Sequence, residues 1–469
     1  MNIDTRTSRT LGVGVRPVHP AYPRRMRLAD RLQVASVTSV AVVIAIFLSD
    51  GGAARFATAA DAVTSLGILA GLVGTDLLLI MLVLAARLPP IDRAFGHDRA
   101  MALHQSLGKP ALYLILCHAA LLITGYALLE NINVFAETWS MLTTLPDMPL
   151  AFVGLGLLVL VVGTSLVVVR RKFRYEAWHA VHLLAYAAVL VAIPHQLSVG
   201  ALLAGGTIAH YYWLALYLAV AGSIALFRFV LPLGRSLRHR LTVDRIDHVA
   251  PGVVSISLTG HHLEQLRATS GQFFIWRFWS RGLWWQAHPF SLSAAPNGRS
   301  LRITVRALGD ASAELPGLRR GVRVSFEGPY GLFTENARTS PRVVLIAAGI
   351  GVAPIRSLLE TASFAPGDAT VILRSHLVGD TYLVDEVTDL CRVRGAQLRI
   401  IAGSRAPDSN GWLPADAARA GVTLRSLVPR VADADIYICG PRLWTDAVVR
   451  DARSGGVPKK QIHYERFDW

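Results

Sequence analysis

Six long apolar stretches, separated by short polar segments, make up most of the first 230 residues. Each stretch is close to or above the ~20 residues that an α-helix needs to cross a bilayer. We therefore predict a six-helix transmembrane domain over residues 31–232, after a flexible basic tail over residues 1–30. The expected spans cover residues 32–48, 62–86, 101–129, 150–169, 177–193 and 208–231.

The pattern changes after Arg240. Short stretches with alternating apolar and polar residues, at 253–258, 301–305 and 322–326, are broken by glycine and proline. They predict the antiparallel strands of a small β-barrel over residues 238–338. From Arg342, apolar strands alternate with glycine loops and helices, with strands at 371–373, 398–401 and 436–438. This alternation predicts a parallel-sheet α/β nucleotide-binding domain over residues 340–469.

Lysine and arginine gather on one side of the expected spans. They lie before the first span, after the sixth, and in the second and fourth connections, whereas the opposite connections contain Arg55 alone beside several acidic residues. The positive-inside rule therefore places both termini in the cytoplasm of a multi-pass plasma-membrane protein. The formal net charge of +15 then reflects orientation and anionic cofactors, not nucleic-acid binding.

A cleaved signal peptide is the alternative interpretation of the first apolar stretch, because small residues follow it between positions 53 and 60. Removing this stretch would leave five spans and would break the alternation of charge. We therefore expect the stretch to be retained as the first of six helices.

The three cysteines, Cys117, Cys391 and Cys439, lie far apart and form no CxxC pair. This pattern excludes a disulfide framework and a cysteine zinc site. The chain also lacks a CxxCH segment, so any haem must be bound without a covalent link. Metal ligands must therefore come from other residue types.

Histidines lie inside two of the expected spans, where ionisable residues are costly and are candidates for function. In the third span, His118 follows His104 by fourteen residues, which returns an α-helix to within about 40° of the same face after a rise of about 21 Å. In the fifth span, His195 follows His182 by thirteen residues and would point roughly 140° away on a regular helix. Pro194 offers a local distortion that would restore the face.

The third and fifth spans run in the same direction, so their histidines pair by level. His104 pairs with His182 toward the cytoplasm, and His118 pairs with His195 toward the outside. This predicts two bis-histidine sites, each suited to a b-type haem that transfers electrons. A single membrane histidine would more simply bond to a neighbouring helix, but four at two matched levels favour two haems. His179 is an interfacial residue or an alternative to His182.

Two charged residues also lie within the expected spans. Lys109 would neutralise a haem propionate or extend to the cytoplasmic interface. Asp76 would relay protons or pair with a polar neighbour. The sequence alone does not choose between these roles.

Two segments of the barrel region carry a further pattern. His288, Pro289, Phe290 and Ser291 follow an aromatic-rich strand, and Arg306 is followed by Gly309, Asp310 and Ser312. These segments resemble the His-Pro-Phe-Thr/Ser and Arg-x-x-Gly-Asp stretches of the NADPH oxidase and ferric reductase family. The resemblance implies that FAD lies along them, with Pro289 to Ser291 near the isoalloxazine ring and with Arg306 and Ser312 near the pyrophosphate.

A glycine turn follows the apolar strand at 343–348. Gly349, Gly351 and Pro354 give the spacing Gly-x-Gly-x-x-Pro, which differs from the general GxGxxG pattern. Glycines let a dinucleotide approach the backbone, and a helix N-terminus favours its phosphates. The turn resembles that of ferredoxin reductase-type NAD(P)H domains.

Two later motifs match the same resemblance. In Cys439-Gly440-Pro441 the family places the cysteine beside the reactive nicotinamide carbon, although a buried structural thiol is the simpler role. Ser404 and Arg405 occupy the position that binds the 2′-phosphate in NADP-dependent relatives, which favours NADPH over NADH. Arg374 is a second candidate for that phosphate.

The chain ends with two aromatic residues, Phe467 and Trp469. Relatives stack a terminal aromatic ring on the flavin, where it must move aside for the nicotinamide. Either residue fits this role, and ordinary strand packing fits both.

The resemblance covers residues 30–469 and implies a complete electron path. NADPH would reduce FAD, and single electrons would pass through the His104/His182 haem and the His118/His195 haem to an outer acceptor. Oxygen would give superoxide, and a ferric chelate, a quinone or a periplasmic partner are the alternatives. Arg55 or His210 would be the basic group near the outer haem. The competing class is a transporter with a nucleotide-sensing domain. The sequence contains no EF-hand loop, so we do not expect calcium gating. The sequence does not indicate an oligomeric state.

Overall fold

The computed structural model describes residues 21–52, 56–170, 175–199, 201–203, 205–405 and 411–467. Trp469 and Arg55 lie outside the described residues. The described chain divides into two compact units, one formed by Met26–Val230 and the other containing the residues from Leu231 onward. Each unit has its own hydrophobic core.

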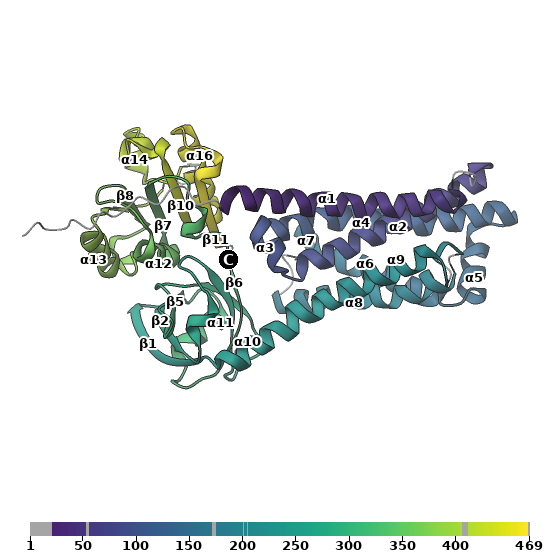
Figure 1. Cartoon of the computed structure of the whole chain (residues 1–469), viewed down its shortest axis with the longest axis horizontal. Helices are drawn as coiled ribbons and strands as arrows, with labels where there is room; N and C mark the ends of the chain where they lie inside the picture. The colour runs from purple at the N-terminus through teal and green to yellow at the C-terminus, as the bar shows by residue number, and fades with distance from the viewer. Residues whose placement is uncertain are drawn as a thin grey trace, which may run out of the picture. The chain divides into compact units, whose positions relative to one another are not determined.

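The first unit is a bundle of long helices with short helical connections (Figure 1). The long helices are α1 (Ala21–Phe47), α2 (Ala59–Ala85), α4 (His97–Glu130), α6 (Met148–Ser165), α8 (Tyr175–Ser198) and α9 (Ile208–Ile224). The short helices are η1 (Leu48–Gly52), α3 (Pro89–Phe95), α5 (Val134–Thr144), α7 (Val167–Arg170), η3 (Ala201–Leu203) and η4 (Ala225–Val230).

Six helical segments are long and apolar enough to cross a bilayer, judged by length and composition. They cover Arg25–Phe47, Ala59–Ala85, Arg99–Glu130, Met148–Ser165, Ala177–Ser198 and Ile208–His239. The six predicted spans are therefore confirmed as helices, and Pro194 lies inside α8, which continues to Ser198. The short helix α5 was not expected from the sequence, because it is too brief to give a clear apolar period.

Helices α2 and α4 pack closely because glycines line the face of α2 that meets α4. A Cβ on Gly67 would lie 3.0 Å from the side chain of Leu122, and a Cβ on Gly74 would lie 2.9 Å from Ile115. Small residues spaced by about one helical turn let two membrane helices approach closely and gain van der Waals contact. The close approach brings the backbone of α2 within reach of side chains on α4.

The second unit begins with α10 (Leu231–His239) and two antiparallel sheets of three strands each. The first sheet has the order β1-β2-β5, and the second has the order β4-β3-β6. The strands are β1 (Thr242–Ala250), β2 (Val253–Thr259), β3 (Phe273–Phe278), β4 (His288–Ser291), β5 (Ser300–Arg306) and β6 (Val324–Tyr330). Short helices η5 (Leu263–Leu266), α11 (Asp310–Glu314) and η6 (Leu315–Gly317) lie between them.

These two sheets share one core, in which Phe274, Trp276 and Phe278 of β3 are fully buried. Isolated bridges from Thr242 to Arg323 and from Leu292 to Ile303 connect segments around the sheets. The antiparallel strands expected from the sequence are therefore present as two sheets, and the closed barrel stays a prediction.

The rest of the second unit is a five-stranded parallel sheet with the order β11-β10-β7-β8-β9. Its strands are β7 (Arg342–Ala348), β8 (Ala369–Ser375), β9 (Gln397–Ala402), β10 (Ala434–Pro441) and β11 (Ile462–Phe467). The longer helices are α12 (Val352–Thr361), α13 (Val384–Arg394) and α16 (Arg442–Ser454). The shorter ones are η7 (Glu335–Ala337), η8 (Gly349–Gly351), η9 (Val378–Asp380), α14 (Ala415–Arg419), α15 (Leu424–Leu427), η10 (Val431–Asp433) and η11 (Lys459–Gln461).

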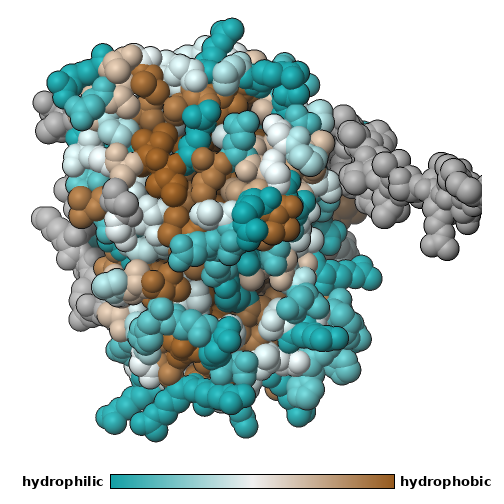
Figure 2. All heavy atoms as spheres, turned by 90° about the vertical axis from the view of Figure 1, so that its left-hand side faces the viewer, coloured by the Kyte–Doolittle hydropathy of each residue, from teal (hydrophilic) through white to brown (hydrophobic). Residues whose placement is uncertain are grey.

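Apolar cores cover both faces of this parallel sheet, which explains why its central strands are apolar at nearly every position. Every residue of β8 is buried, and so are all residues of β10 except the last. The face drawn in Figure 2 carries many hydrophilic side chains, with hydrophobic ones gathered toward its middle. The α/β architecture predicted from the sequence is thus present.

A buried carboxylate ties three segments together at the amino end of the parallel sheet. Asp435 has no exposed surface and accepts hydrogen bonds from the backbone N–H of Thr339, at 2.7 Å, and of Ser340. The Nε2 of His463 lies 2.8 Å from its other oxygen. The carboxylate therefore fixes the segment before β7 and the start of β11 to β10.

Replacing Asp435 with alanine should destabilise the second unit by about 3 kcal/mol, because two buried N–H groups and an imidazole lose their acceptor. Thermal unfolding of the full chain, followed by the loss of near-ultraviolet circular dichroism, should shift down by about 6–12 °C. Asp389 forms an exposed ion pair with Arg392, so an Asp389→Ala variant is the matched control. It should shift the unfolding temperature little. An unchanged transition for the Asp435→Ala variant would contradict the role assigned to this carboxylate.

Candidate functional site

The structure brings His104 of α4 and His182 of α8 together in the first unit. Their ring centroids lie 6.1 Å apart, with the ring planes inclined at 67°. An imidazole nitrogen bonds a metal ion at about 2 Å, so two such bonds and the half-widths of two rings account for a separation of this size. The spacing suits one metal ion between the two rings.

Hydrogen bonds at Nδ1 decide which nitrogen of each ring is available. The Nδ1 of His104 lies 3.0 Å from the carbonyl oxygen of Met81, which can only accept, so His104 donates there. The Nδ1 of His182 lies 3.1 Å from the hydroxyl of Ser165. That hydroxyl donates its one hydrogen to the carbonyl of Val161 at 2.7 Å, so it accepts from His182. Both rings therefore keep a lone pair at Nε2.

The ring of His182 is also held by stacking. Trp178 stacks on it, with centroids 5.0 Å apart and ring planes inclined at 27°, and donates its indole N–H to the Ser165 hydroxyl at 3.3 Å. The guanidinium of Arg170 lies over the Trp178 ring, 4.5 Å from its centroid. His179 is exposed and tilted beside Trp178, so the structure pairs His104 with His182.

The second pair, His118 and His195, lies further along the same two helices. The Nδ1 of His118 donates to the carbonyl of Gly67 at 2.9 Å, and a Cβ on Gly71 would lie 2.4 Å from the same nitrogen. His195 lies within electrostatic range of His118 and of Asp147. His195 also interacts with the backbone of Ala192, one turn earlier in α8.

A pair of histidines suits a metal that brings most of its own ligands. In the described part of the chain, no three or more His, Cys, Asp or Glu side chains gather as a metal-binding group. Haem iron needs only two axial ligands from the protein, and two neutral imidazoles with Nε2 free are such a pair. The donor set of the first pair therefore fits a haem.

The other polar residues of the spans have partners of their own. Asp76 is fully buried and accepts a hydrogen bond from Ser39 at 2.8 Å, and the Ser39 hydroxyl lies 3.3 Å from that of Tyr212. This contact agrees with a polar-pairing role for Asp76. Lys109 is exposed on α4, and the Nδ1 of His210 donates to the carbonyl of Leu203 at 2.9 Å.

In the second unit, strand β4 carries the segment expected beside the flavin. His288 stacks on Phe290, with centroids 5.7 Å apart, and the indole of Trp276 donates to the Phe290 carbonyl at 3.0 Å. Burial, with Arg277 nearby, lowers the pKa of His288. Pro289 is exposed, whereas Ser291 is buried and donates to Glu465 of β11 at 3.2 Å.

The second expected flavin segment forms a turn. The Ser312 hydroxyl accepts from the N–H groups of Leu308, at 2.9 Å, and Gly309, at 3.0 Å, and so holds the start of α11. Arg306 is exposed at the end of β5, and its guanidinium lies 6.0 Å from the ring centre of Tyr382.

Two glycines let the turn after β7 lie against the end of β10. A Cβ on Gly351 would lie 2.1 Å from the carbonyl oxygen of Cys439, and a Cβ on Gly440 would lie 2.7 Å from the ring of Trp444. Gly349 has a φ of +55°, which favours glycine. Pro354 is buried in the first turn of α12. The two loops therefore meet with no side chain between them.

Cys439 is fully buried at the carboxyl end of β10. Burial raises the pKa of its thiol well above the ordinary range, and the neighbouring carboxylate of Glu465 raises it further. Glu465 pairs with Cys439 in the β10–β11 register and also contacts Ser291. Glu465 could not be identified from the sequence, because neither strand alone shows the register in which two parallel strands pair.

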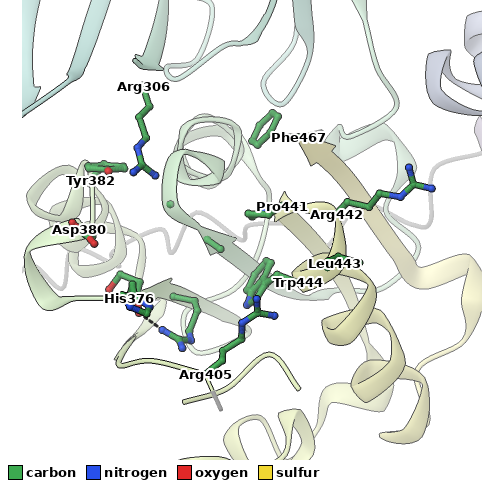
Figure 3. Close-up of a pocket in the computed structure, with 14 residues that line it drawn as sticks. Arg306, His376, Asp380, Tyr382, Arg405, Pro441, Arg442, Leu443, Trp444 and Phe467 are labelled. Carbon is green, nitrogen blue, oxygen red and sulfur yellow. Dashed lines mark hydrogen bonds between the residues drawn. The ribbon is translucent and has the colours of Figure 1, made fainter. Parts of the chain in front are cut away.

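A pocket of about 480 Å³ lies at the carboxyl ends of these strands, a size typical of ligand sites. Arg306 and Phe467 lie toward one end of it, and Arg405 and His376 lie toward the other (Figure 3). Pro441 and Arg442 also line it. His376 and Arg442 were not anticipated, since a single basic residue just after a strand gives no signal.

The two arginines proposed for the 2′-phosphate differ in their surroundings. Arg374 is buried, and its guanidinium donates to backbone carbonyls, including those of Trp412 at 3.2 Å and Gly403. Burial, with the charge of Arg405, lowers the pKa of Arg374. Arg405 and Ser404 are exposed, and the Ser404 hydroxyl lies 3.2 Å from Nε2 of His376. Both arginines line the pocket, but the guanidinium of Arg374 is engaged with backbone carbonyls, whereas Arg405 is exposed.

Two family models match the chain in succession. Residues 70–193 match a ferric reductase like transmembrane component, and residues 246–334 match an FAD-binding domain. The chain belongs to the NADPH oxidase and ferric reductase family. The first match includes three of the four paired histidines and ends just before His195. The second includes His288 to Ser291 and Arg306 to Ser312.

Curated relatives match up to about two fifths of this family member. Ferredoxin--NADP reductase B of Sorangium cellulosum is 30% identical over 189 residues, which cover 38% of this chain and 77% of that protein. The flavohemoprotein of Vibrio cholerae serotype O1 is 30% identical over 188 residues, which cover 38% of this chain and 45% of that protein. The chain spans about half the length of the flavohemoproteins it matches.

Solved structures align with about half of the chain. The FAD/NAD binding domain of nitric oxide dioxygenase from Vibrio cholerae O1 biovar El Tor gives a TM-score of 0.39 at 24% identity, covering 49% of this chain and 99% of that one. A ferredoxin NADP+ reductase from Neisseria gonorrhoeae gives a TM-score of 0.39 at 17% identity, covering 48% of this chain and 97% of that one.

Cys439 should resist alkylation by a maleimide between pH 7 and 9, because its raised pKa keeps it as a thiol and only the thiolate reacts. Burial raises the pKa of Cys391 to about 11, so this thiol should resist as well. Mass spectrometry of digested protein would measure both, and both should label once the chain is denatured. Labelling of Cys439 in the folded chain at the rate of a free thiol would contradict its placement as a buried thiol with a raised pKa.

Proposed function

We propose that this chain is a membrane oxidoreductase that carries electrons from NADPH, through FAD and two b-type haems, to an acceptor on the outer side. The proposal rests most on the His104/His182 pair, whose ring separation and Nδ1 hydrogen bonds suit a metal bound through both Nε2 atoms. The match to a ferric reductase like transmembrane component supports it.

The histidine pairs would supply the axial ligands. Haem iron held between two imidazoles transfers single electrons and leaves no open axial position for oxygen. His104 and His182 would form the inner site, where Ser165 and Trp178 fix the imidazole of His182. His118 and His195 would form the outer site, where the Gly67 carbonyl orients His118.

The second unit would carry out the two-electron step. FAD accepts a hydride from a nicotinamide and can release electrons singly. Ser291, Cys439 and Glu465 lie together between the flavin strand and the dinucleotide turn. The Ser291 hydroxyl donates to Glu465, and Cys439 keeps its proton, so its compact neutral side chain would border the nicotinamide. Phe467 lines the adjoining pocket, where it would cover the flavin until the nicotinamide replaces it.

Basic residues of the pocket favour NADPH over NADH. Arg405 and Ser404 are exposed at the end of β9, and His376 lies beside them at the end of β8. A guanidinium and a hydroxyl suit the oxygens of a 2′-phosphate. Arg306 would face the remaining phosphates from the other end of the pocket.

The acceptor would be oxygen, giving superoxide, or a ferric chelate. Purified full-length protein in detergent should show the Soret band of a bis-histidine haem, and anaerobic NADPH should reduce flavin and haem. Reoxidation would then be compared with oxygen, a ferric chelate and a soluble quinone, with superoxide dismutase as the control. Protein without a Soret band, or with a haem that stays oxidised when NADPH is added, would contradict this proposal.

A Gly71→Ala substitution should remove the outer haem and leave the inner one, because the new Cβ would lie 2.4 Å from the His118 ring. The haem-to-protein ratio should fall from about two toward one, measured by pyridine haemochrome, while flavin reduction by NADPH continues at the wild-type rate. Gly156 of α6 is the matched control, since a Cβ there would meet nothing within 4 Å. Two haems in both variants would contradict the outer site.

A further inference from the structure

A network of ion pairs joins the antiparallel sheets of the second unit to its parallel-sheet part. Arg302 of β5 donates two hydrogen bonds to Glu386 of α13, at 3.0 and 2.8 Å. Glu386 also pairs with Arg356 of α12, whose Nε lies 2.8 Å from the same carboxylate oxygen. One carboxylate therefore bridges an arginine from each part of the unit.

Both ends of the network continue to backbone groups. Arg302 donates to the hydroxyl and carbonyl oxygens of Ser293, at 3.1 and 2.9 Å. Arg356 pairs with Glu360, which accepts a hydrogen bond from the backbone N–H of Ala295 at 2.7 Å. The antiparallel side of the network is thus the segment 293–295, directly after His288 to Ser291.

The parallel-sheet side leads to the dinucleotide turn. Arg356 and Glu360 lie on α12, which begins directly after Gly349 to Gly351. The network therefore links the segment that follows the proposed flavin strand to the helix that follows the proposed nucleotide turn. These are the two elements whose spacing decides how closely a nicotinamide approaches a flavin.

The geometry of the network is restrictive. The Arg302 and Arg356 side chains are only 19% and 12% exposed. A bidentate guanidinium–carboxylate pair fixes direction as well as distance. Burial alone raises the pKa of Glu386, but the hydrogen bonds and charges of Arg302 and Arg356 outweigh it and hold that pKa below its usual range. The carboxylate thus stays ionised at neutral pH and keeps both arginines.

We propose that Glu386 is a positioning residue, which holds the nucleotide turn at the correct distance from the flavin strand for hydride transfer. The inference rests on the proposed function, because it assumes that NADPH reduces FAD at this site. The step moves one hydride from NADPH to FAD and takes one proton from solvent, giving NADP⁺ and FADH₂. Glu386 touches none of the reacting groups and acts through α12 and the segment 293–295.

This role makes a specific prediction about rate and binding. A misplacement of about 1 Å can slow a reaction by roughly 100-fold. Glu386 is not among the residues that line the pocket, so its removal should leave nucleotide binding nearly unchanged. A Glu386→Ala variant should therefore reduce its flavin about 10–100-fold more slowly, with an NADP⁺ dissociation constant within about twofold of wild type. The charge-transfer absorbance between reduced flavin and NADP⁺ should weaken, since it reports ring stacking.

Companion variants separate positioning from folding. Glu386→Gln keeps the shape and one acceptor oxygen and should recover part of the rate. Arg302→Lys keeps the charge but not the bidentate geometry and should be slowed. Asp368→Ala is the matched control, because it breaks a similarly half-buried pair with Arg342, at 3.0 Å, within the parallel-sheet part alone. Asp368→Ala should reduce its flavin at the wild-type rate.

The experiment is anaerobic stopped-flow reduction of full-length protein in detergent, with FAD content and thermal unfolding measured on each variant. Slow reduction with normal FAD content and normal NADP⁺ affinity in Glu386→Ala would support the proposal. Wild-type rates in both Glu386→Ala and Arg302→Lys, or equal slowing in Asp368→Ala, would overturn it. A wild-type protein whose flavin is not reduced by NADPH would instead remove the proposed function on which the inference rests.

Discussion

A histidine placed among apolar helices needs an acceptor for its ring N–H, because the hydrocarbon core offers no water to supply one. The first unit meets this need with backbone carbonyls of α2, which accept from His104 and His118. Those bonds require α4 to lie very close to α2. The glycines of α2 allow that approach, so helix packing and imidazole orientation depend on one contact.

The two histidines of α8 depart from this arrangement. His182 is oriented by a serine hydroxyl and a tryptophan, and His195 interacts with the backbone of Ala192, one turn earlier in its own helix. A stronger hydrogen bond at Nδ1 makes the Nε2 of a histidine a more basic metal ligand. The two pairs thus present different environments to whatever they bind, although their residue types are identical.

Buried and half-buried carboxylates organise the second unit in a comparable way. Asp435 joins three segments at the amino end of the parallel sheet, Glu465 lies between Ser291 and Cys439 at its carboxyl end, and Glu386 joins the two parts of the unit. Each accepts from or pairs with groups far away in the sequence. Such contacts select one arrangement of the elements, whereas the apolar cores alone would tolerate small shifts.

The sequence was sufficient for features that repeat along the chain. Apolar length predicted the six spans, and the alternation of strands and helices predicted the parallel sheet. The sequence did not predict contacts between different elements. The place of Glu465 beside Cys439 depends on the register of two strands, and the role of Arg374 depends on backbone carbonyls that lie near it. The spacing of His182 and His195 along α8 looked irregular, because the sequence does not show what the neighbouring helices contribute to each pair.

The two carbonyls of α2 that accept from His104 and His118 restrict where residues can be inserted into α2 or α4. Met81 and Gly67 are fourteen residues apart, and so are His104 and His118, which bond to them in the opposite order. The two antiparallel helices therefore act as matched rulers, with a rise of about 21 Å between the bonded levels. A residue inserted between the levels in one helix alone would break at least one bond. Insertions and deletions in this region would have to occur in both helices together.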